Sequence, residues 1–137
     1  MYRWIEHTGE VELEIDSDSE ESVFADALDA VSELLRDADE EDFAGAAGPR
    51  LERTISLTAE DRARLLAAWL GELAFLAETE GLVPDGLSDL RVGNGVLDAT
   101  VHGYESDPPH LIKAVTYHRL WFAPQRGRWR AHAVLDV

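Results

Sequence analysis

The sequence has no cysteine, a single lysine and no long hydrophobic run, and each absence excludes a class of protein. Without cysteine, a chain of 137 residues forms no disulfide, no thiolate metal site and no cysteine nucleophile. The most apolar stretch, residues 65–77, is too short to span a bilayer and contains Glu72. The first 14 residues are charged and lack the apolar segment of a signal peptide. We therefore expect one cytoplasmic domain over residues 1–137.

Basic residues are also scarce, with 12 Lys+Arg against 28 Asp+Glu and a formal net charge of −16. A protein that binds nucleic acid or anionic membranes on its own needs a basic footprint, so no direct tight binding to either is expected. The charge is uneven, because residues 111–137 hold Lys113 and four arginines against Asp136 alone. Two interpretations remain: a compositional bias of the proteome, and an acidic face that steers a basic partner.

Hydrophobic periodicity divides the chain into strands and two helices. Residues 10–15 and 51–57 alternate as strands do, and helical spacing covers residues from about 20 to 37. A second helix follows a capping box at residues 58–61 and stops at Gly81. Residues 87–92 and 96–101 form one hairpin, and residues 112–122 and 129–137 form another. Residues 38–50 show no periodicity and are expected to be the most mobile loop.

This order of elements predicts an α+β fold of two layers, a mainly antiparallel sheet with two helices packed on one face. In the first predicted strand, Glu10, Glu12 and Glu14 share the face opposite the aliphatic side chains. The simplest interpretation is a solvated face, paired with Arg128 and Arg130 if the first and last strands are neighbours.

Histidines and glycines offer only weak signals for catalysis. The glycines at 93 and 95 lack the spacing of a phosphate-binding loop and indicate a turn. His118 and His132 would approach each other across the last hairpin, with Asp136 on the face of His132. No tight ligand pair supports a zinc site or a hydrolase there, so solvated histidines are the preferred interpretation.

The end of the chain suggests a different site. Asp136 and Val137 place a side-chain carboxylate and a main-chain carboxylate on adjacent residues. A third acidic oxygen from the polar face of the first strand, such as Glu10, would complete an oxygen-only cluster. Such a cluster selects Ca²⁺ or Mg²⁺ rather than Zn²⁺.

Four segments resemble the archease family, in the right order over nearly the whole chain. Residues 7–10 (HTGE) resemble its opening motif His-Thr-Ala-Asp, and residues 65–73 (LLAAWLGEL) fit its second-helix segment. Residues 112–118 (IKAVTYH) resemble its most recognisable block, and residues 134–137 (VLDV) its closing motif. The chain departs from the family at Gly9, where alanine is usual, and at Glu10, where aspartate is usual.

The resemblance implies an archease-like α+β protein that is not itself an enzyme. Its partner would be the GTP-dependent 3′-phosphate RNA ligase of tRNA splicing and RNA repair, whose guanylylation and multiple turnover it promotes. The family's metal, typically Ca²⁺ with Mg²⁺ or Mn²⁺ as alternatives, would bind Glu10, Asp136 and Val137. Lys113 and His118 also match family positions and are candidates for contact with the partner. The alternative is an acidic metal-binding or chaperone-like module without effect on ligase turnover.

Overall fold

The computed structural model describes residues 1–36 and 48–137, which form two helices and seven strands. The strands are β1 (Tyr2–His7), β2 (Glu10–Ser17), β3 (Arg50–Thr58), β4 (Leu82–Gly93), β5 (Val96–Glu105), β6 (Ala114–Gln125) and β7 (Arg128–Asp136). The helices are α1 (Glu20–Leu35) and α3 (Arg62–Glu80). Most of the loop predicted over residues 38–50 lies outside the described residues. Neither described helix is long and apolar enough to cross a membrane.

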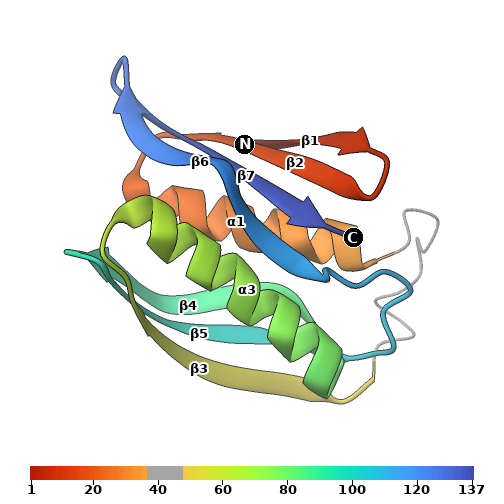
Figure 1. Cartoon of the computed structure of the whole chain (residues 1–137). Helices are drawn as coiled ribbons and strands as arrows, with labels where there is room; N and C mark the ends of the chain where they lie inside the picture. The colour runs from red at the N-terminus through yellow and green to blue at the C-terminus, as the bar shows by residue number, and fades with distance from the viewer. Residues whose placement is uncertain (37–47) are drawn as a thin grey trace.

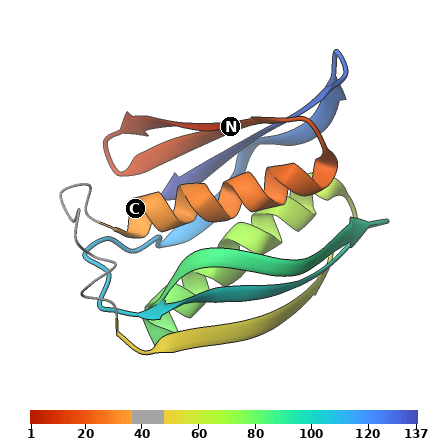
Figure 2. The same ribbon diagram turned by 180° about the vertical axis from the view of Figure 1, so that it is seen from behind.

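The strands form two antiparallel sheets with the helices between them (Figures 1 and 2). Sheet A has the order β1-β2-β7-β6, and sheet B has the order β3-β5-β4. The α+β class and the antiparallel pairing are thus confirmed, but the strands divide into two sheets where one was expected. Alternating side chains show which face of a strand is buried, not which strands pair, so the pattern leaves this division open.

The helix ends follow from capping residues. Ser19 caps α1 by accepting a hydrogen bond from the Ser22 backbone N–H at 3.1 Å. Asp61 caps α3 in the same way, because its carboxylate accepts a hydrogen bond from the Arg64 backbone N–H at 2.8 Å. The predicted capping box that starts at Thr58 is therefore wrong, since Thr58 ends β3. As predicted, α3 ends at Gly81, whose φ of +67° lies in the left-handed region that glycine adopts most easily.

The core joins both helices to sheet A. Trp69 of α3 is fully buried, and its indole N–H donates to the backbone carbonyl of Phe24 in α1 at 3.0 Å. Phe24 in turn contacts Phe122 of β6, with ring centroids 5.6 Å apart. Buried residues surround much of each helix, because each helix contacts both sheets. This arrangement leaves the far face of sheet A free of helices.

Strand β1 was not predicted from the sequence. It pairs with β2 along its whole length, with Tyr2 opposite Ile15 and His7 opposite Glu10. Its alternation is short and is interrupted by Ile5, which sits opposite Glu12 on the outward side. Tyr2 and Trp4 pack against the core, so tertiary burial rather than a clear local pattern defines this edge strand.

Candidate functional site

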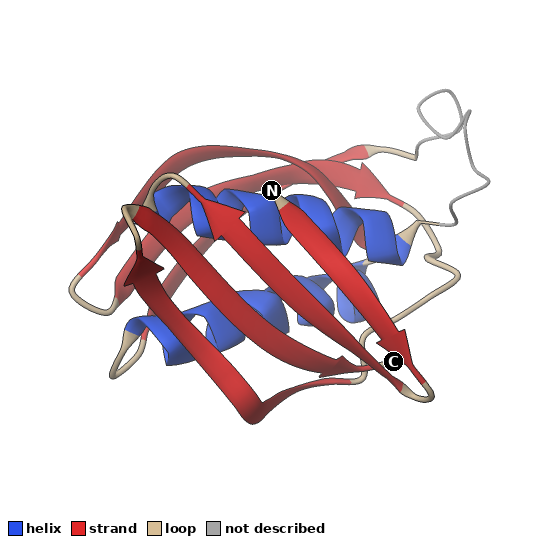
Figure 3. Cartoon of the chain, turned by 90° about the horizontal axis from the view of Figure 1, so that it is seen from above, coloured by secondary structure: helices blue, strands red, loops and turns tan. Residues whose placement is uncertain are grey.

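The site is on the outer face of sheet A, which we define as the face turned away from the helices (Figure 3). The strand register arranges outward side chains in rows across the four strands. One row runs from His7 through Glu10 and Asp136 to Ala114. We call Glu10, Asp136 and Val137 the acidic end, because they lie together at one end of this face.

The acidic end contains the three residues that the sequence suggested as candidate metal ligands, Glu10, Asp136 and Val137. Glu10 is directly opposite Asp136 in the β2–β7 ladder, where side chains are about 5 Å apart at Cβ. The Val137 N–H donates to the Gly9 carbonyl at 3.1 Å, which holds Val137 against the β1–β2 turn. The Lys113 N–H donates to the Asp136 carbonyl at 2.8 Å. Two elements far apart in sequence therefore hold the backbone of these three residues together.

Neither Glu10 nor Asp136 forms an ion pair with a basic side chain among the described residues. Like charges directly opposite each other on neighbouring strands are unfavourable, so the pair favours a bound cation. Residues 1–36 and 48–137 contain no group of three His, Asp or Glu side chains placed for a metal ion. A metal here would need the main-chain carboxyl of Val137 as its third ligand, and this all-oxygen set suits Ca²⁺, Mg²⁺ or Mn²⁺.

The two other candidates lie at different places. Lys113 is exposed just before β6 and lines a surface hollow of about 620 Å³ together with His110, Leu111 and Val137. It is thus adjacent to the acidic end. His118 is exposed further along β6, in an irregular segment between Thr116 and Trp121.

That irregular segment overturns the expected approach of His118 to His132. Thr116 pairs with Val134, but the next paired residue of β6 is Trp121, which is opposite His132. The extra residues bulge out of the ladder, and Arg119 takes a positive φ of 55°. His118 remains exposed while His132 is buried, so the two do not form a site.

His132 instead belongs to a buried charge cluster that the sequence did not suggest. Its centre is Glu12, which is only 6% exposed, so the prediction of a solvated Glu12 is wrong. One carboxylate oxygen of Glu12 is 2.9 Å from His132 Nε2 and 3.0 Å from a terminal nitrogen of Arg119. The other oxygen binds His7 Nε2. Hydrogen bonds from His7 and His132 hold the pKa of Glu12 below its usual value.

The second ring nitrogen of His132 anchors the bulge. Nδ1 is 2.7 Å from the backbone carbonyl of Arg119, while Nε2 faces the Glu12 carboxylate. Both ring nitrogens of His132 therefore face oxygen atoms, one of a backbone carbonyl and one of a carboxylate. The cluster thereby ties β1, β2, β6 and β7 together next to the acidic end.

The arginines of β7 have a different partner from the one expected. Strands β2 and β7 are neighbours, as the hypothesis required, but Arg128 and Arg130 bind Asp16 instead of the glutamates. Their Nε atoms lie 2.6 and 3.5 Å from the two Asp16 carboxylate oxygens. The hydrogen bond from Arg128 lowers the pKa of Asp16. Glu14 pairs with Arg3 of β1 at 2.5 Å.

Comparison with known proteins identifies the family of this chain. The model of the Archease protein family matches residues 2–137. The chain belongs to the archease family. The archease of Methanopyrus kandleri is 30% identical over 144 residues, covering 97% of this chain and 96% of the relative. The archease of Methanosarcina mazei is also 30% identical, covering 99% of this chain and 95% of the relative.

Two solved structures share the archease fold. Methanobacterium thermoautotrophicum protein 1598 superposes with a TM-score of 0.69 at 25% identity, covering 99% of this chain and 98% of the other. A Thermotoga maritima protein, described as an archease and possible chaperone, superposes with a TM-score of 0.68. The two sequences are 20% identical, and the superposition covers 100% of this chain and 98% of the Thermotoga maritima chain. At this identity the likeness supports the fold alone.

Proposed function

We propose that this archease-family chain is a non-catalytic activator of a GTP-dependent 3′-phosphate RNA ligase. It would promote guanylylation and multiple turnover of the ligase in tRNA splicing and RNA repair. Family membership and the four matching segments support this proposal. The observation that carries it is the acidic end, where Glu10 faces Asp136 and neither carboxylate has a basic partner among the described residues.

In this proposal, the acidic end holds a divalent cation through Glu10, Asp136 and Val137. Ca²⁺ is the first candidate, with Mg²⁺ and Mn²⁺ as alternatives, because all three accept oxygen ligands. The longer Glu10 side chain reaches one methylene further than the family's aspartate. When bound, the cation supplies positive charge that attracts the phosphates of GTP at the ligase active site.

The surroundings of the acidic end provide a docking edge for the ligase. Lys113 lies beside it, lines the hollow with Leu111 and has no ion-pair partner among the described residues. Its ammonium group would bind a carboxylate or phosphate of the partner. The Glu12 cluster keeps the neighbouring strands in register and does not contact the partner in this proposal.

A ligase turnover assay with a matched pair of variants tests this function. Asp136→Asn removes one carboxylate charge at the acidic end with almost no change of shape. Asp89→Asn makes the same charge change at an exposed position of β4 in sheet B. We expect Asp136→Asn to abolish stimulation of guanylylation and turnover, and Asp89→Asn to keep it.

Equal stimulation by Asp136→Asn and the unaltered chain would refute the role of the acidic end. If the unaltered chain binds the ligase and leaves its rate unchanged, the chaperone-like alternative is correct. Calorimetric titration with CaCl₂ tests the metal separately: the unaltered chain should bind, and Glu10→Gln should bind at least ten-fold more weakly, about 1.4 kcal/mol in free energy.

A further inference from the structure

The end of the outer face furthest from the acidic end concentrates arginine. Arg126, Arg128 and Arg130 lie at the tip of the β6–β7 hairpin, around a surface hollow of about 660 Å³. Asp16 and Gln125 complete its lining. We call these three arginines together with Trp121 the arginine end.

The guanidinium groups are held in place and remain partly available. Asp16 binds Arg128 and Arg130 through their Nε atoms, at 2.6 and 3.5 Å. Among the described residues, no hydrogen bond from a terminal nitrogen of Arg130 accompanies this contact. Arg126, at the turn, forms no ion pair with any residue in 1–36 or 48–137. Guanidinium groups with free terminal nitrogens are well suited to phosphate oxygens.

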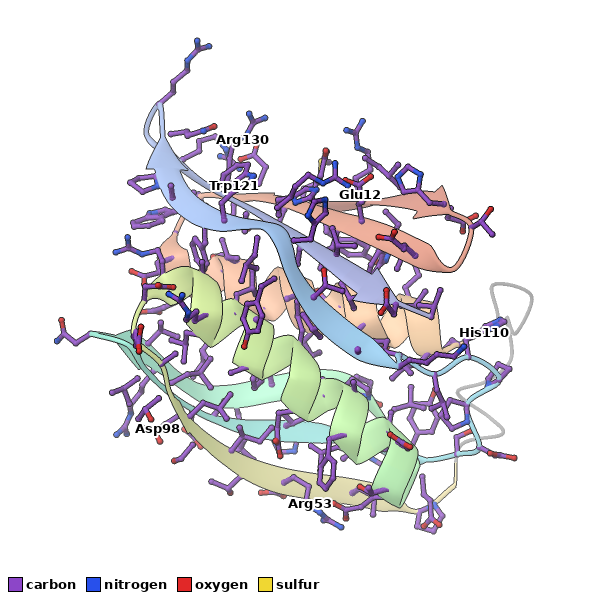
Figure 4. The ribbon with its side chains drawn as sticks, in the orientation of Figure 1. Glu12, Arg53, Asp98, His110, Trp121 and Arg130 are labelled. Carbon is purple, nitrogen blue, oxygen red and sulfur yellow. The ribbon has the colours of Figure 1, made fainter. Side chains whose placement is uncertain are left out.

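An exposed aromatic ring extends this surface along the sheet. Trp121 is 39% exposed and points outward, in the row adjacent to the row that contains Arg130 (Figure 4). Successive rows are about 7 Å apart, since they are separated by two residues along each strand. Aromatic rings on a sheet face beside basic side chains are typical of surfaces that bind unpaired bases.

We propose that the arginine end binds single-stranded RNA, with phosphates on Arg126 and Arg130 and a base stacked on Trp121. The chain carries a net charge of −16, but the lining of the hollow is locally positive, because it holds three arginines against one carboxylate, that of Asp16. The remaining acidic surface repels RNA and so directs it to this end. Binding here does not depend on the proposed activation of a ligase.

Fluorescence anisotropy of a labelled 12-nucleotide oligouridylate, titrated with the full chain at physiological ionic strength, tests the phosphate contacts. We expect a Kd of about 10⁻⁴ M, the weak end of non-specific binding. Arg126→Gln should weaken binding about five-fold and reduce the slope of log K against log[salt] by nearly one. Arg91→Gln is the matched control, since Arg91 is an exposed arginine of β4 and the charge change is identical.

Trp121 provides the second readout. Trp121→Ala should weaken binding about ten-fold without changing the salt slope, and Trp121→Phe should retain most of the affinity. A duplex of the same length should bind more weakly, because its bases are not available for stacking. Equal losses for Arg126→Gln and Arg91→Gln would overturn the proposal, as would binding unaffected by Trp121→Ala or no binding at 1 mM chain. Pyrophosphate that displaces the RNA, together with an RNA affinity that Trp121→Ala leaves unchanged, would show a site for free phosphate and refute the role of the base.

Discussion

The tight turn from α3 to β4 gives a quantitative test of the fold. Gly81 has a φ of +67°, and a Cβ added there would lie 2.4 Å from the backbone carbonyl oxygen of Ser106. The same two residues are joined by a hydrogen bond of 2.8 Å from the Ser106 N–H to the Gly81 carbonyl. Gly127 has a φ of +77°, but a Cβ there would meet no atom within 4 Å. The two glycines thus share a backbone conformation and differ in the space around them.

The difference predicts unequal costs for two alanine substitutions. Left-handed backbone costs an alanine about 1–2 kcal/mol, partly offset by about 0.4–1 kcal/mol from the less flexible unfolded chain. Gly127→Ala should therefore cost about 1 kcal/mol. Gly81→Ala must also move the Ser106 carbonyl by nearly 1 Å, which adds about 1–3 kcal/mol for overpacking. Its total cost should be about 3 kcal/mol.

Urea unfolding followed by tryptophan fluorescence measures both costs. With an m-value of about 2 kcal/mol/M, the midpoint should fall by about 1.5 M for Gly81→Ala and about 0.5 M for Gly127→Ala. Equal shifts would refute the reasoning, because they would mean that the segment around Ser106 moves aside without cost. An unchanged m-value is required for the comparison, since a change would indicate altered compactness rather than stability alone.

Three further predictions concern the core, the charge cluster and pH. Trp69→Phe should cost about 2–3 kcal/mol in urea unfolding, because it removes the indole hydrogen bond to Phe24 and leaves a buried gap. Glu12→Gln should lower the midpoint more than Glu14→Gln, since only Glu12 is buried among an arginine and two histidines; equal shifts would contradict this. The Arg64 backbone N–H lowers the pKa of Asp61 in the folded chain. The stabilisation that ionised Asp61 gives the fold is therefore complete above its pKa in the unfolded chain, about 3.9, and is lost as the pH falls through its pKa in the folded chain. Asp61→Asn should therefore reduce stability at pH 7 and match the unaltered chain at pH 2; a constant difference between these pH values would exclude an ionic contribution.

The acidic end shows how far sequence patterns predict a site. The alternation of residues 10–15 and 129–137 assigns Glu10 and Asp136 to the polar faces of two strands, and the structure confirms both assignments. Their proximity needed one further fact, the pairing of β2 with β7, which no local pattern contains. The carboxylates at the chain end and the family resemblance suggested this pairing as a hypothesis. The register of β2 and β7 in the structure then places Glu10 opposite Asp136.

Glu12 shows why the rest of the site could not be predicted. It lies on the same polar face as Glu10 and Glu14, so the local pattern assigns all three to solvent. Its burial arises from the bulge in β6, which turns Arg119 back over the sheet with a positive φ and covers the carboxylate. Arginine rarely adopts that conformation, and two of the three contacts of Glu12, those with Arg119 and His132, come from residues more than 100 positions away in sequence. The local sequences of β2 and β6 carry no signal for this arrangement.

The distribution of charge over the outer face is more informative than the net charge of the chain. Along sheet A, the acidic strand β2 lies between β1 and β7, and Arg3, Arg119, Arg128 and Arg130 neutralise all its carboxylates except Glu10. Arg126 at the hairpin tip has no ion-pair partner among the described residues, and Glu10 and Asp136, which also have none, lie at the other end of β7, about 26 Å away. A cation and a phosphate chain would therefore bind at opposite ends of one rigid sheet. Substitutions at one end should leave binding at the other unchanged, because the separation exceeds the Debye length and the neutralised rows lie between them.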